Sequence, residues 1–456
     1  MPPLGLLVFV VGAGSLGAEI AGVRLLAPYF GASTIVWANT ISVVLVALSL
    51  GYWLGGRLAD RHPTRRALCQ LSLGAAVLLA AVPFAGKPLL SAGTAALDGV
   101  SVGAFFGSLA AVSVLLSVPI LLMGAVSPWA LRLAVRGVED AGTVAGRLYA
   151  ISTAGSLAGT LLSALVLIPA IGTRSTFLVL ALAMAVTAVL GLRPRRVYLA
   201  VPVAIGALLT VHEGPIEVAS RNEKVIYEQD TAYQFAAVVQ QHDGTRLLQL
   251  NEGHAIHSEF RPGKYLTGNY WDDMLVLPSV ALGRALRSVA ILGNGGGTTA
   301  RALGHYFPRT RVDAVEIDPA LTSIGRRYFG LGGPRLHVHT ADARVFLRRT
   351  HNRYDAILLD VYRQPYIPFY MVTREFFSLA RSRLAPGGAV IVNAGHPEGD
   401  YQLERVLAST LRSVFPSVMS DPVTPTNSQL VATARPFSRS TLSLPPALQS
   451  VARAAA

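Results

Sequence analysis

A glycine-rich turn between two apolar runs is the feature that most limits how this chain can fold. The segment SVAILGNGGGTTA extends from Ser288 to Ala300, and a second apolar run, AVEID, ends about twenty residues later at Asp318. An apolar run that enters a turn of glycines and continues into a helix-like pattern is typical of a nucleotide-binding α/β sheet. The second half of the chain is therefore expected to contain a soluble α/β domain.

The first half of the chain has the composition of a membrane protein. The first 212 residues hold 13 Lys/Arg and 5 Asp/Glu, although the 456-residue chain holds 39 and 26. Six apolar runs are long enough, or nearly so, to cross a hydrocarbon core of ~30 Å. They lie at 4–26, 36–56, 67–86, 104–131, 144–171 and 175–192. We predict an N-terminal all-α bundle with six spans, or seven if the short run 197–211 also crosses.

Basic residues indicate how such a bundle would be oriented. Arginines gather after the second, fourth and sixth runs, at 57–66, 132–147 and 193–196. An even number of crossings separates these clusters, so they share one side, which the positive-inside rule assigns to the cytoplasm. The protein is thus expected to be a multi-pass protein of the cell membrane, with the lipid bilayer as a partner. Its soluble half is expected in the cytoplasm, where a nucleotide-type cosubstrate would be found.

The net charge, the single cysteine and a pair of glycines further limit the expected partners, metal sites and helix packing. The net charge of +13 comes without a basic stripe that carries interleaved aromatic residues, so nucleic acid is not expected as a partner. The single cysteine, Cys69, excludes an internal disulfide and a cysteine-based metal site. Gly155 and Gly159, in GSLAG, form a small-residue face suited to close helix packing. Whether the chain forms a homo-oligomer stays open.

The second half divides into segments with different patterns. Residues 213–286 predict a small β-domain, with a hairpin around Gly244, because apolar and polar residues roughly alternate. Residues 287–440 alternate between strand-like and helix-like segments, and 441–456 form a tail. The strands are expected at 288–292, 312–316, 336–340, 355–360 and 388–393, and the run at 430–432 would close the sheet. This alternation predicts a doubly wound, Rossmann-like sheet of the S-adenosylmethionine-dependent methyltransferase type.

Three acids follow successive strands of this predicted sheet. Glu316 ends the second strand and can accept hydrogen bonds from both hydroxyls of a ribose. Asp342 follows the third strand, where it could accept from an adenine amino group, and Asp360 ends the fourth. Asp318 is interpreted instead as an N-cap before Pro319. Ligands bind at the carboxyl ends of parallel strands, so the three acids would face one ligand.

The glycine spacing favours an adenosyl sulfonium over a nicotinamide. Gly293 and Gly295 fit the dinucleotide fingerprint, but its last glycine is replaced by Thr298. A G-x-G-G-G turn that is followed by an acid after the second strand suits S-adenosylmethionine-type ligands better. The turn lets the main chain approach such a ligand closely.

From about Tyr227 to His396 these residues resemble the spermidine synthases, the polyamine aminopropyltransferases. In particular the chain resembles their membrane-fused bacterial versions. The family's Tyr-Gln pair resembles Tyr233-Gln234, and its glycine-rich segment resembles residues 293–298. Its V-E-I-D, G-D-A and L-x-P-G-G segments resemble residues 315–318, 341–343 and 384–388. Its acceptor segment resembles Tyr270-Trp271-Asp272, and the first aspartate of its D-S-S-D-P resembles Asp360.

The resemblance implies the reaction and the roles of the matching residues. In the family, decarboxylated S-adenosylmethionine donates an aminopropyl group to a small amine, with no permanently bound cofactor and no metal. Asp360 would be the catalytic base, while Tyr270, Asp272, Gly296, Tyr362 and Arg363 would contact the substrates. The donor would be bound by the residues that match the family's nucleoside site, namely Gln234, Gly293, Gly295, Gly297, Glu316, Asp342 and Ala343.

Three departures from the family pattern keep other functions open. Gly296 and Arg363 replace two family aspartates, and Trp271 replaces a histidine or glutamine. A cation at 363 could pair with the carboxylate of intact S-adenosylmethionine, so methyl transfer, aminocarboxypropyl transfer or cleavage of that donor is an alternative. A second alternative is a transporter or receptor whose soluble half senses a nucleoside. Glu19, in the first predicted span, motivates it.

Overall fold

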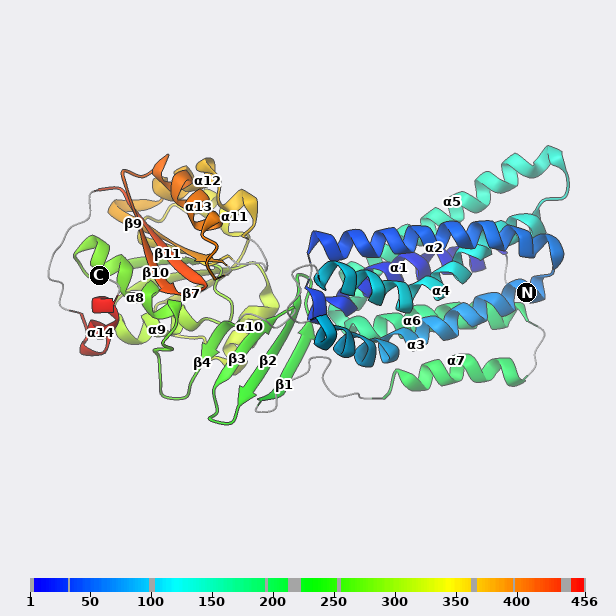
Figure 1. The fold of residues 1–456 in the computed structure, drawn as a ribbon, viewed down its shortest axis with the longest axis horizontal. Helices are drawn as coiled ribbons and strands as arrows, with labels where there is room; N and C mark the ends of the chain where they lie inside the picture. Colours follow the sequence, from blue (N-terminus) through cyan, green and yellow to red (C-terminus); the bar gives the residue numbers. More distant parts are fainter. Residues whose placement is uncertain are drawn as a thin grey trace. The chain divides into compact units, whose positions relative to one another are not determined.

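A computed structural model describes most of the chain. The described residues are 4–31, 33–97, 103–192, 196–211, 223–251, 256–361, 367–396, 398–435 and 444–454. They form two compact units. The first comprises Met1–Val218 with Tyr227–Ala237 and Leu250–Ala255, and the second comprises Ala219–Ile226, Val238–Gln249 and Ile256–Ala456. Figure 1 shows the elements of both units.

The first unit consists mainly of long apolar helices (Figure 1). They are α1 (Leu4–Phe30), α2 (Thr34–Arg61), α3 (Arg65–Leu97), α4 (Gly103–Ala134), α5 (Val138–Leu162), the π-helical turn η1 (Ser163–Leu167), α6 (Ile168–Gly191) and α7 (Arg196–Leu208). Among the described residues, five helical stretches are long and apolar enough to cross a membrane, with 138–191 counted as one. The predicted spans at 144–171 and 175–192 meet inside that stretch at Gly172, whose φ of 80° and ψ of 166° break the helix.

Glycines allow two pairs of these helices to approach closely. A Cβ added at Gly155 or Gly159 would collide with the main chain of α1 at Phe9 or Ala13. A Cβ at Gly51, in α2, would collide with the carbonyl oxygen of Leu121 in α4. The prediction that GSLAG packs closely is therefore confirmed, since only glycine fits these contacts.

The small β-sheet has four strands in the order β1-β2-β3-β4. They are β1 (Glu223–Asp230), β2 (Phe235–Gln241), β3 (Arg246–Leu250) and β4 (Ile256–Phe260). The hairpin between β2 and β3 turns at Gly244, where the φ of 84° requires a residue without a side chain. The hairpin predicted from the sequence is confirmed.

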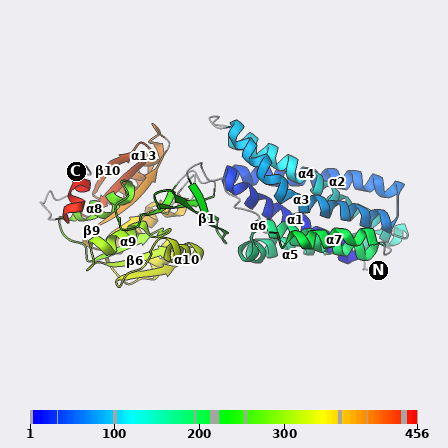
Figure 2. The ribbon, with the colours of Figure 1, turned by 90° about the horizontal axis from the view of Figure 1, so that it is seen from below.

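The larger sheet has seven strands in the order β10-β11-β9-β8-β5-β6-β7. Figure 2 labels β6, β9 and β10 of this sheet. They are β5 (Ser288–Leu292), β6 (Arg311–Glu316), β7 (Leu336–Thr340), β8 (Tyr354–Leu359), β9 (Leu384–Gly395), β10 (Ser417–Thr424) and β11 (Asn427–Thr433). The strands β5 to β9 are parallel, whereas β11 pairs antiparallel with β9 and β10 antiparallel with β11. The expected strands are all present, but the sheet is mixed, and β10 was not expected.

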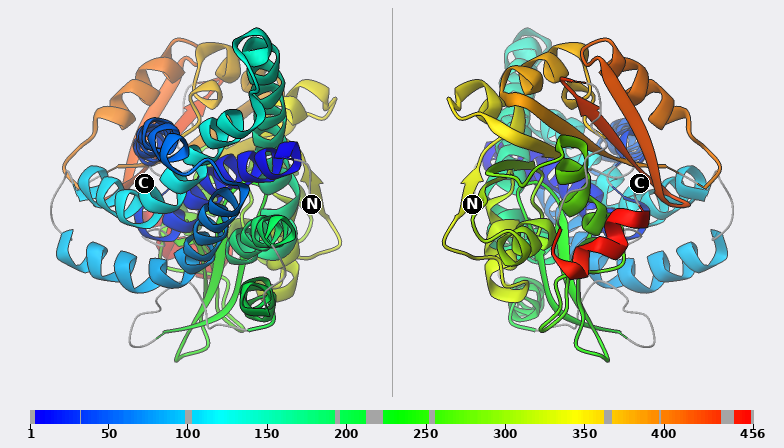
Figure 3. Two further views of the ribbon diagram at one scale, coloured as in Figure 1. Left: turned by 90° about the vertical axis from the view of Figure 1, so that its right-hand side faces the viewer. Right: turned by 90° about the vertical axis from the view of Figure 1, so that its left-hand side faces the viewer.

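Helices cover both faces of this sheet, as expected for a doubly wound fold. One face packs on α8 (Tyr270–Leu282), α9 (Thr298–Tyr306) and α14 (Pro446–Ala454). The other packs on α11 (Ala343–Arg349), α12 (Arg374–Ser382) and α13 (Gln402–Arg412). Two further helices, α10 (Pro319–Tyr328) and the short 3₁₀ helix η2 (Phe369–Met371), complete the unit. In Figure 3, α14 is the red helix, which contacts α8. Neither α8 nor α14 was predicted from the sequence.

Candidate active site

The glycine-rich turn between β5 and α9 forms the centre of the site. Gly293, Gly295 and Gly297 have φ angles of 85°, 53° and 95°, a region that side chains disfavour. The Gly293 N–H donates to the carbonyl of Val315 at 3.0 Å, which fixes the turn to the end of β6. A Cβ at Gly293 would collide with the carbonyl oxygen of Asp360. The turn and the end of β8 are therefore in direct main-chain contact.

Glu316 ends β6 beside this turn. Its carboxylate accepts from the N–H of Gly295 at 2.8 Å and from the N–H of Asp318 at 3.0 Å. Burial raises the pKa of Glu316 to about 7, although the two main-chain donors act in the opposite direction. Asp318 itself accepts from the N–H of Ala320 at 3.0 Å, so its interpretation as the N-cap of α10 is confirmed.

Asp342 and Ala343 lie where β7 gives way to α11. One oxygen of Asp342 accepts from the N–H of Val345 at 2.9 Å and caps the helix, which Ala343 begins. The other oxygen accepts from the Tyr370 hydroxyl at 3.2 Å. Tyr370 comes from η2, which follows β8 in the chain and was not expected near the site. Its hydroxyl occupies one acceptor position of the acid that was predicted to hold adenine.

Asp360 follows β8 and is partly buried. One of its oxygens accepts from the Asn393 amide at 2.8 Å and the other from the Tyr270 hydroxyl at 3.1 Å. Burial raises the pKa of Asp360 to about 6, although hydrogen bonds from Asn393, Tyr270 and Trp271 favour the carboxylate. The structure thus brings together Tyr270 and Asp360, two of the predicted site residues.

Asn393 is a site residue that the sequence reading missed. It lies in β9, is 4% exposed, and its oxygen accepts from the amides of Asn427 at 3.0 Å and Gln429 at 3.2 Å. These two donors fix the orientation of the Asn393 amide, so its NH₂ group is directed at Asp360. A polar residue inside the apolar run AVIVNA was the available signal, because a buried amide needs partners.

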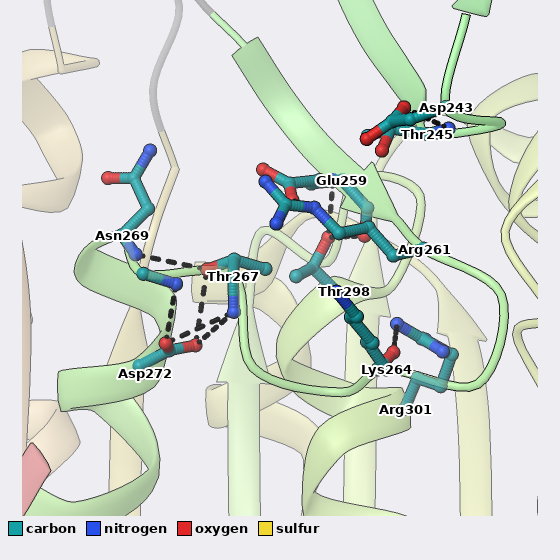
Figure 4. Close-up of polar contacts among 11 residues, drawn as sticks. Asp243, Thr245, Glu259, Arg261, Lys264, Thr267, Asn269, Asp272, Thr298 and Arg301 are labelled. Atoms are coloured by element: carbon teal, nitrogen blue, oxygen red, sulfur yellow. Dashed lines mark hydrogen bonds and ion pairs between the residues drawn. The ribbon is translucent and has the colours of Figure 1, made fainter. Parts of the chain in front are cut away.

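Two predicted substrate contacts are engaged in local structure. The Asp272 carboxylate accepts from the N–H groups of Thr267 at 3.0 Å and Gly268 at 2.7 Å, and from the Thr267 hydroxyl (Figure 4). The Gly296 N–H donates to the Ser258 hydroxyl at 2.8 Å. Asp272 thus holds the turn ahead of α8, and Gly296 is tied to β4. Their roles toward a substrate stay predictions.

Three further predicted residues are not brought to Asp360 by the described contacts. Gln234 closes the turn between β1 and β2, where its N–H donates to the Thr231 hydroxyl at 2.9 Å. Tyr362 and Arg363 lie outside the described residues.

The described residues contain no group of three or more His, Cys, Asp or Glu side chains that could hold a metal ion.

Comparison with known proteins identifies the family. Residues 270–434 match the spermine/spermidine synthase domain. A polyamine aminopropyltransferase of Vibrio vulnificus is 30% identical over 220 residues, which cover 47% of this chain and 72% of that protein. The chain belongs to the polyamine aminopropyltransferase family. The matched domain contains Tyr270, Glu316, Asp342, Asp360 and Asn393.

The share of its own length that a relative matches differs between relatives. A probable polyamine aminopropyl transferase of Bifidobacterium longum is 36% identical over 190 residues, or 41% of this chain and 42% of that protein. The chain therefore spans less than half of that relative's length. A solved structure of a probable spermidine synthase from Corynebacterium glutamicum is 21% identical, with a TM-score of 0.41, over 47% of this chain and 81% of its own.

Proposed function

We propose that this protein transfers an aminopropyl group from decarboxylated S-adenosylmethionine to a small amine and releases methylthioadenosine. The observation that carries the proposal is Asp360. This residue follows the central strand β8, and its main-chain carbonyl lies against Gly293 of the glycine turn. Its carboxylate accepts hydrogen bonds from Tyr270 and Asn393. A carboxylate held in this way can accept a proton beside a bound donor.

The reaction needs one proton transfer and one displacement. Asp360 accepts a proton from the ammonium group of the acceptor, which frees the nitrogen lone pair. The nitrogen attacks the methylene carbon next to the sulfonium, so a C–N bond forms and the C–S bond breaks. The bonding electron pair goes to sulfur, which becomes the neutral thioether of methylthioadenosine. The protein contributes orientation of the two substrates and the proton acceptor.

The donor would lie along the carboxyl edge of the sheet. Glu316 would accept from the ribose hydroxyls, and Asp342 would accept from the adenine amino group in place of the Tyr370 hydroxyl. Gly293, Gly295 and Gly297 would let the main chain approach the nucleoside. Gln234, Tyr362 and Arg363 remain proposed contacts from the family resemblance.

Product analysis of the full-length protein tests this function. With decarboxylated S-adenosylmethionine and a panel of small diamines, we expect methylthioadenosine and an aminopropylated amine in equal amounts, measured by mass spectrometry. Intact S-adenosylmethionine is the comparison donor. Formation of S-adenosylhomocysteine would indicate methyl transfer instead, and the absence of any nucleoside product from either donor would contradict an enzymatic role.

We infer that the long apolar helices cross a bilayer and that the catalytic half remains on the cytoplasmic side. The helix α7 has 13 residues. At 1.5 Å per residue it reaches about 20 Å, which is less than a hydrocarbon core of about 30 Å. The clustered arginines after α2 and α4 and before α7 would face the same side.

A reporter fused after Ala456 tests this topology. We expect a green fluorescent protein fusion to fluoresce and an alkaline phosphatase fusion at the same site to be inactive, because phosphatase requires export. The paired fusions control for expression. An active phosphatase with a dark fluorescent protein would place the catalytic half outside the cytoplasm.

A further inference from the structure

A cavity lies at the amino ends of β6 and β7, whereas Asp360 lies at the carboxyl end of β8. It has a volume of about 440 Å³ and is lined by residues at the starts of β6 and β7, by residues along α9 from Ala300 to His305, and by the segment 330–335. Asp360, Glu316 and the glycine turn all lie at the carboxyl ends of the strands. No described residue that was predicted to bind the donor or the acceptor lines the cavity, so it is separate from the proposed aminopropyl-transfer site.

Arg301, on α9, is the main charged group of this cavity. Its side chain is nine-tenths buried, since only 8% of the residue is exposed. One guanidinium nitrogen, Nη2, donates to the carbonyl of Lys264 at 2.8 Å, and Nε has no hydrogen-bond partner (Figure 4). The acid whose charge acts on Arg301 is Glu259, but Glu259 forms its ion pair with Arg261 at 2.7 Å. Buried charges are normally paired with an opposite charge, and Arg301 forms no ion pair of its own among the described residues, although Glu259 lies near enough to favour its charge.

Aromatic rings hold the Arg301 guanidinium in place. Its central carbon lies 4.7 Å from the ring centre of Phe260 and 4.6 Å from that of Tyr265. Tyr265 in turn stacks on His305, with 3.7 Å between the ring centres. Ring faces attract a cation but supply no full negative charge. The guanidinium is thus fixed in position while its charge remains available to an anion.

The other walls of the cavity also favour an anion. Arg335 and His305 line it and are exposed, so they add donors at its rim. No Asp or Glu lines the cavity among the residues that the structure describes. The segment 330–335 contributes three glycines to the wall, so space is left for a ligand.

We propose that this cavity binds a small soluble oxyanion, in which a phosphate or carboxylate group pairs with Arg301. Arg335 and His305 would complete the contacts at the rim. This site is additional to the aminopropyl-transfer site and does not depend on that assignment. The N–H donors of an arginine guanidinium lie in one plane, so they can bond to two oxygens of a phosphate or carboxylate group at once.

Calorimetric titration of the full-length protein in detergent, with inorganic phosphate and with citrate as probes, tests the site. We expect saturable binding at low millimolar concentration or tighter. Arg301→Met should weaken it by about tenfold or more. Because that change also removes the bond to Lys264, a second variant is needed. Gly304 lines the cavity, and an added Cβ there meets nothing within 4 Å. Gly304→Glu would therefore place a carboxylate in the cavity wall to repel an anion, and Gly304→Gln is the uncharged control of the same size.

The outcomes separate the proposal from general salt effects. Support requires weakened binding in Gly304→Glu and Arg301→Met, with near wild-type binding in Gly304→Gln. If neither probe shows saturable binding to the wild type, the site does not exist. Equal affinity in Gly304→Glu and Gly304→Gln would assign any observed binding to another part of the protein and would overturn the proposal.

Discussion

Replacement of Asp360 with asparagine is expected to lower kcat for methylthioadenosine release by about 10²- to 10⁴-fold. Asparagine has nearly the same shape but cannot accept a proton from the attacking ammonium. The effect should fall on kcat more than on the KM for the donor, because the Asp360 side chain is assigned to the proton and not to the nucleoside. Steady-state kinetics with the two substrates varied in turn would measure both values.

The pH dependence of the wild-type rate provides an independent test of Asp360 as the catalytic base. The pKa of Asp360 is raised to about 6, so the carboxylate is protonated as pH falls through that value. Glu316, whose pKa is about 7, titrates in the same range, so the limb is measured as kcat at saturating donor, where Glu316 already holds the ribose. We expect kcat to decrease about tenfold per pH unit below a pH of about 6, and this limb should be absent in the residual activity of Asp360→Asn. Asp243→Asn is the control, since Asp243 is exposed in the turn between β2 and β3 and asparagine is also common in turns. A flat wild-type profile from pH 5 to pH 7 would contradict the assignment.

Gly293→Ala is expected to have the second large effect, through geometry instead of charge. Gly293 has a φ of 85°, and an added Cβ would meet the Asp360 carbonyl. Relief of that collision must displace the turn or the end of β8, and misplacement by about 1 Å can cost about 10²-fold in rate. We expect a loss of that order in kcat/KM, with a fall in stability of roughly 1–3 kcal/mol from the strained conformation.

Gly304→Ala is the matched control for that substitution. Gly304 lies in the exposed part of α9, where an added Cβ meets nothing within 4 Å. Alanine should stabilise the helix there by roughly 0.5–1 kcal/mol and leave kcat/KM unchanged. Thermal unfolding and steady-state kinetics on both variants would measure the contrast. Similar behaviour of the two would mean that the Gly293 conformation has no role in the site.

The sequence allowed the prediction of the parallel core because its strands are short apolar runs separated by helix-like segments. Fully buried strands such as β8 need continuous apolar residues, and this pattern is visible without a structure. Glu316, Asp342 and Asp360 could be predicted for a related reason. Glu316 ends β6, Asp360 directly follows β8, and Asp342 lies two residues after β7, so the topology of a parallel sheet brings all three to one edge.

Other elements could not be predicted because their signals conflict with simple periodicity. The helix α8 is buried along its first ten residues, Tyr270 to Ser279, and contains Pro278. It therefore shows neither an apolar stripe nor an uninterrupted helix-forming sequence. The antiparallel pairing of β10 and β11 depends on the hairpin turn that joins them at 425–426, where no Asn-Gly or Gly-Gly marks the turn.

The hydrogen-bond partners of a side chain also could not be predicted from the sequence. Asp272 was expected to hold the acceptor amine. Its carboxylate oxygens instead accept hydrogen bonds from the N–H groups of Thr267 and Gly268, which lie five and four residues earlier in the chain. Asn393 presents the opposite case, since its importance comes from residues that are 34 and 36 positions away. Both outcomes depend on the folded geometry of loops and sheet edges.

The contact between Gly296 and Ser258 limits which side chains the glycine turn can carry at this position. An added Cβ at Gly296 would lie 3.0 Å from the Ser258 Cβ and 3.2 Å from the Phe329 ring. Any side chain at this position would therefore press on both of these neighbours. Shifts of a few tenths of an ångström in Ser258 or Phe329 would relieve these contacts, so the effect of a side chain at 296 would be transmitted to the strand β4 and to the end of α10.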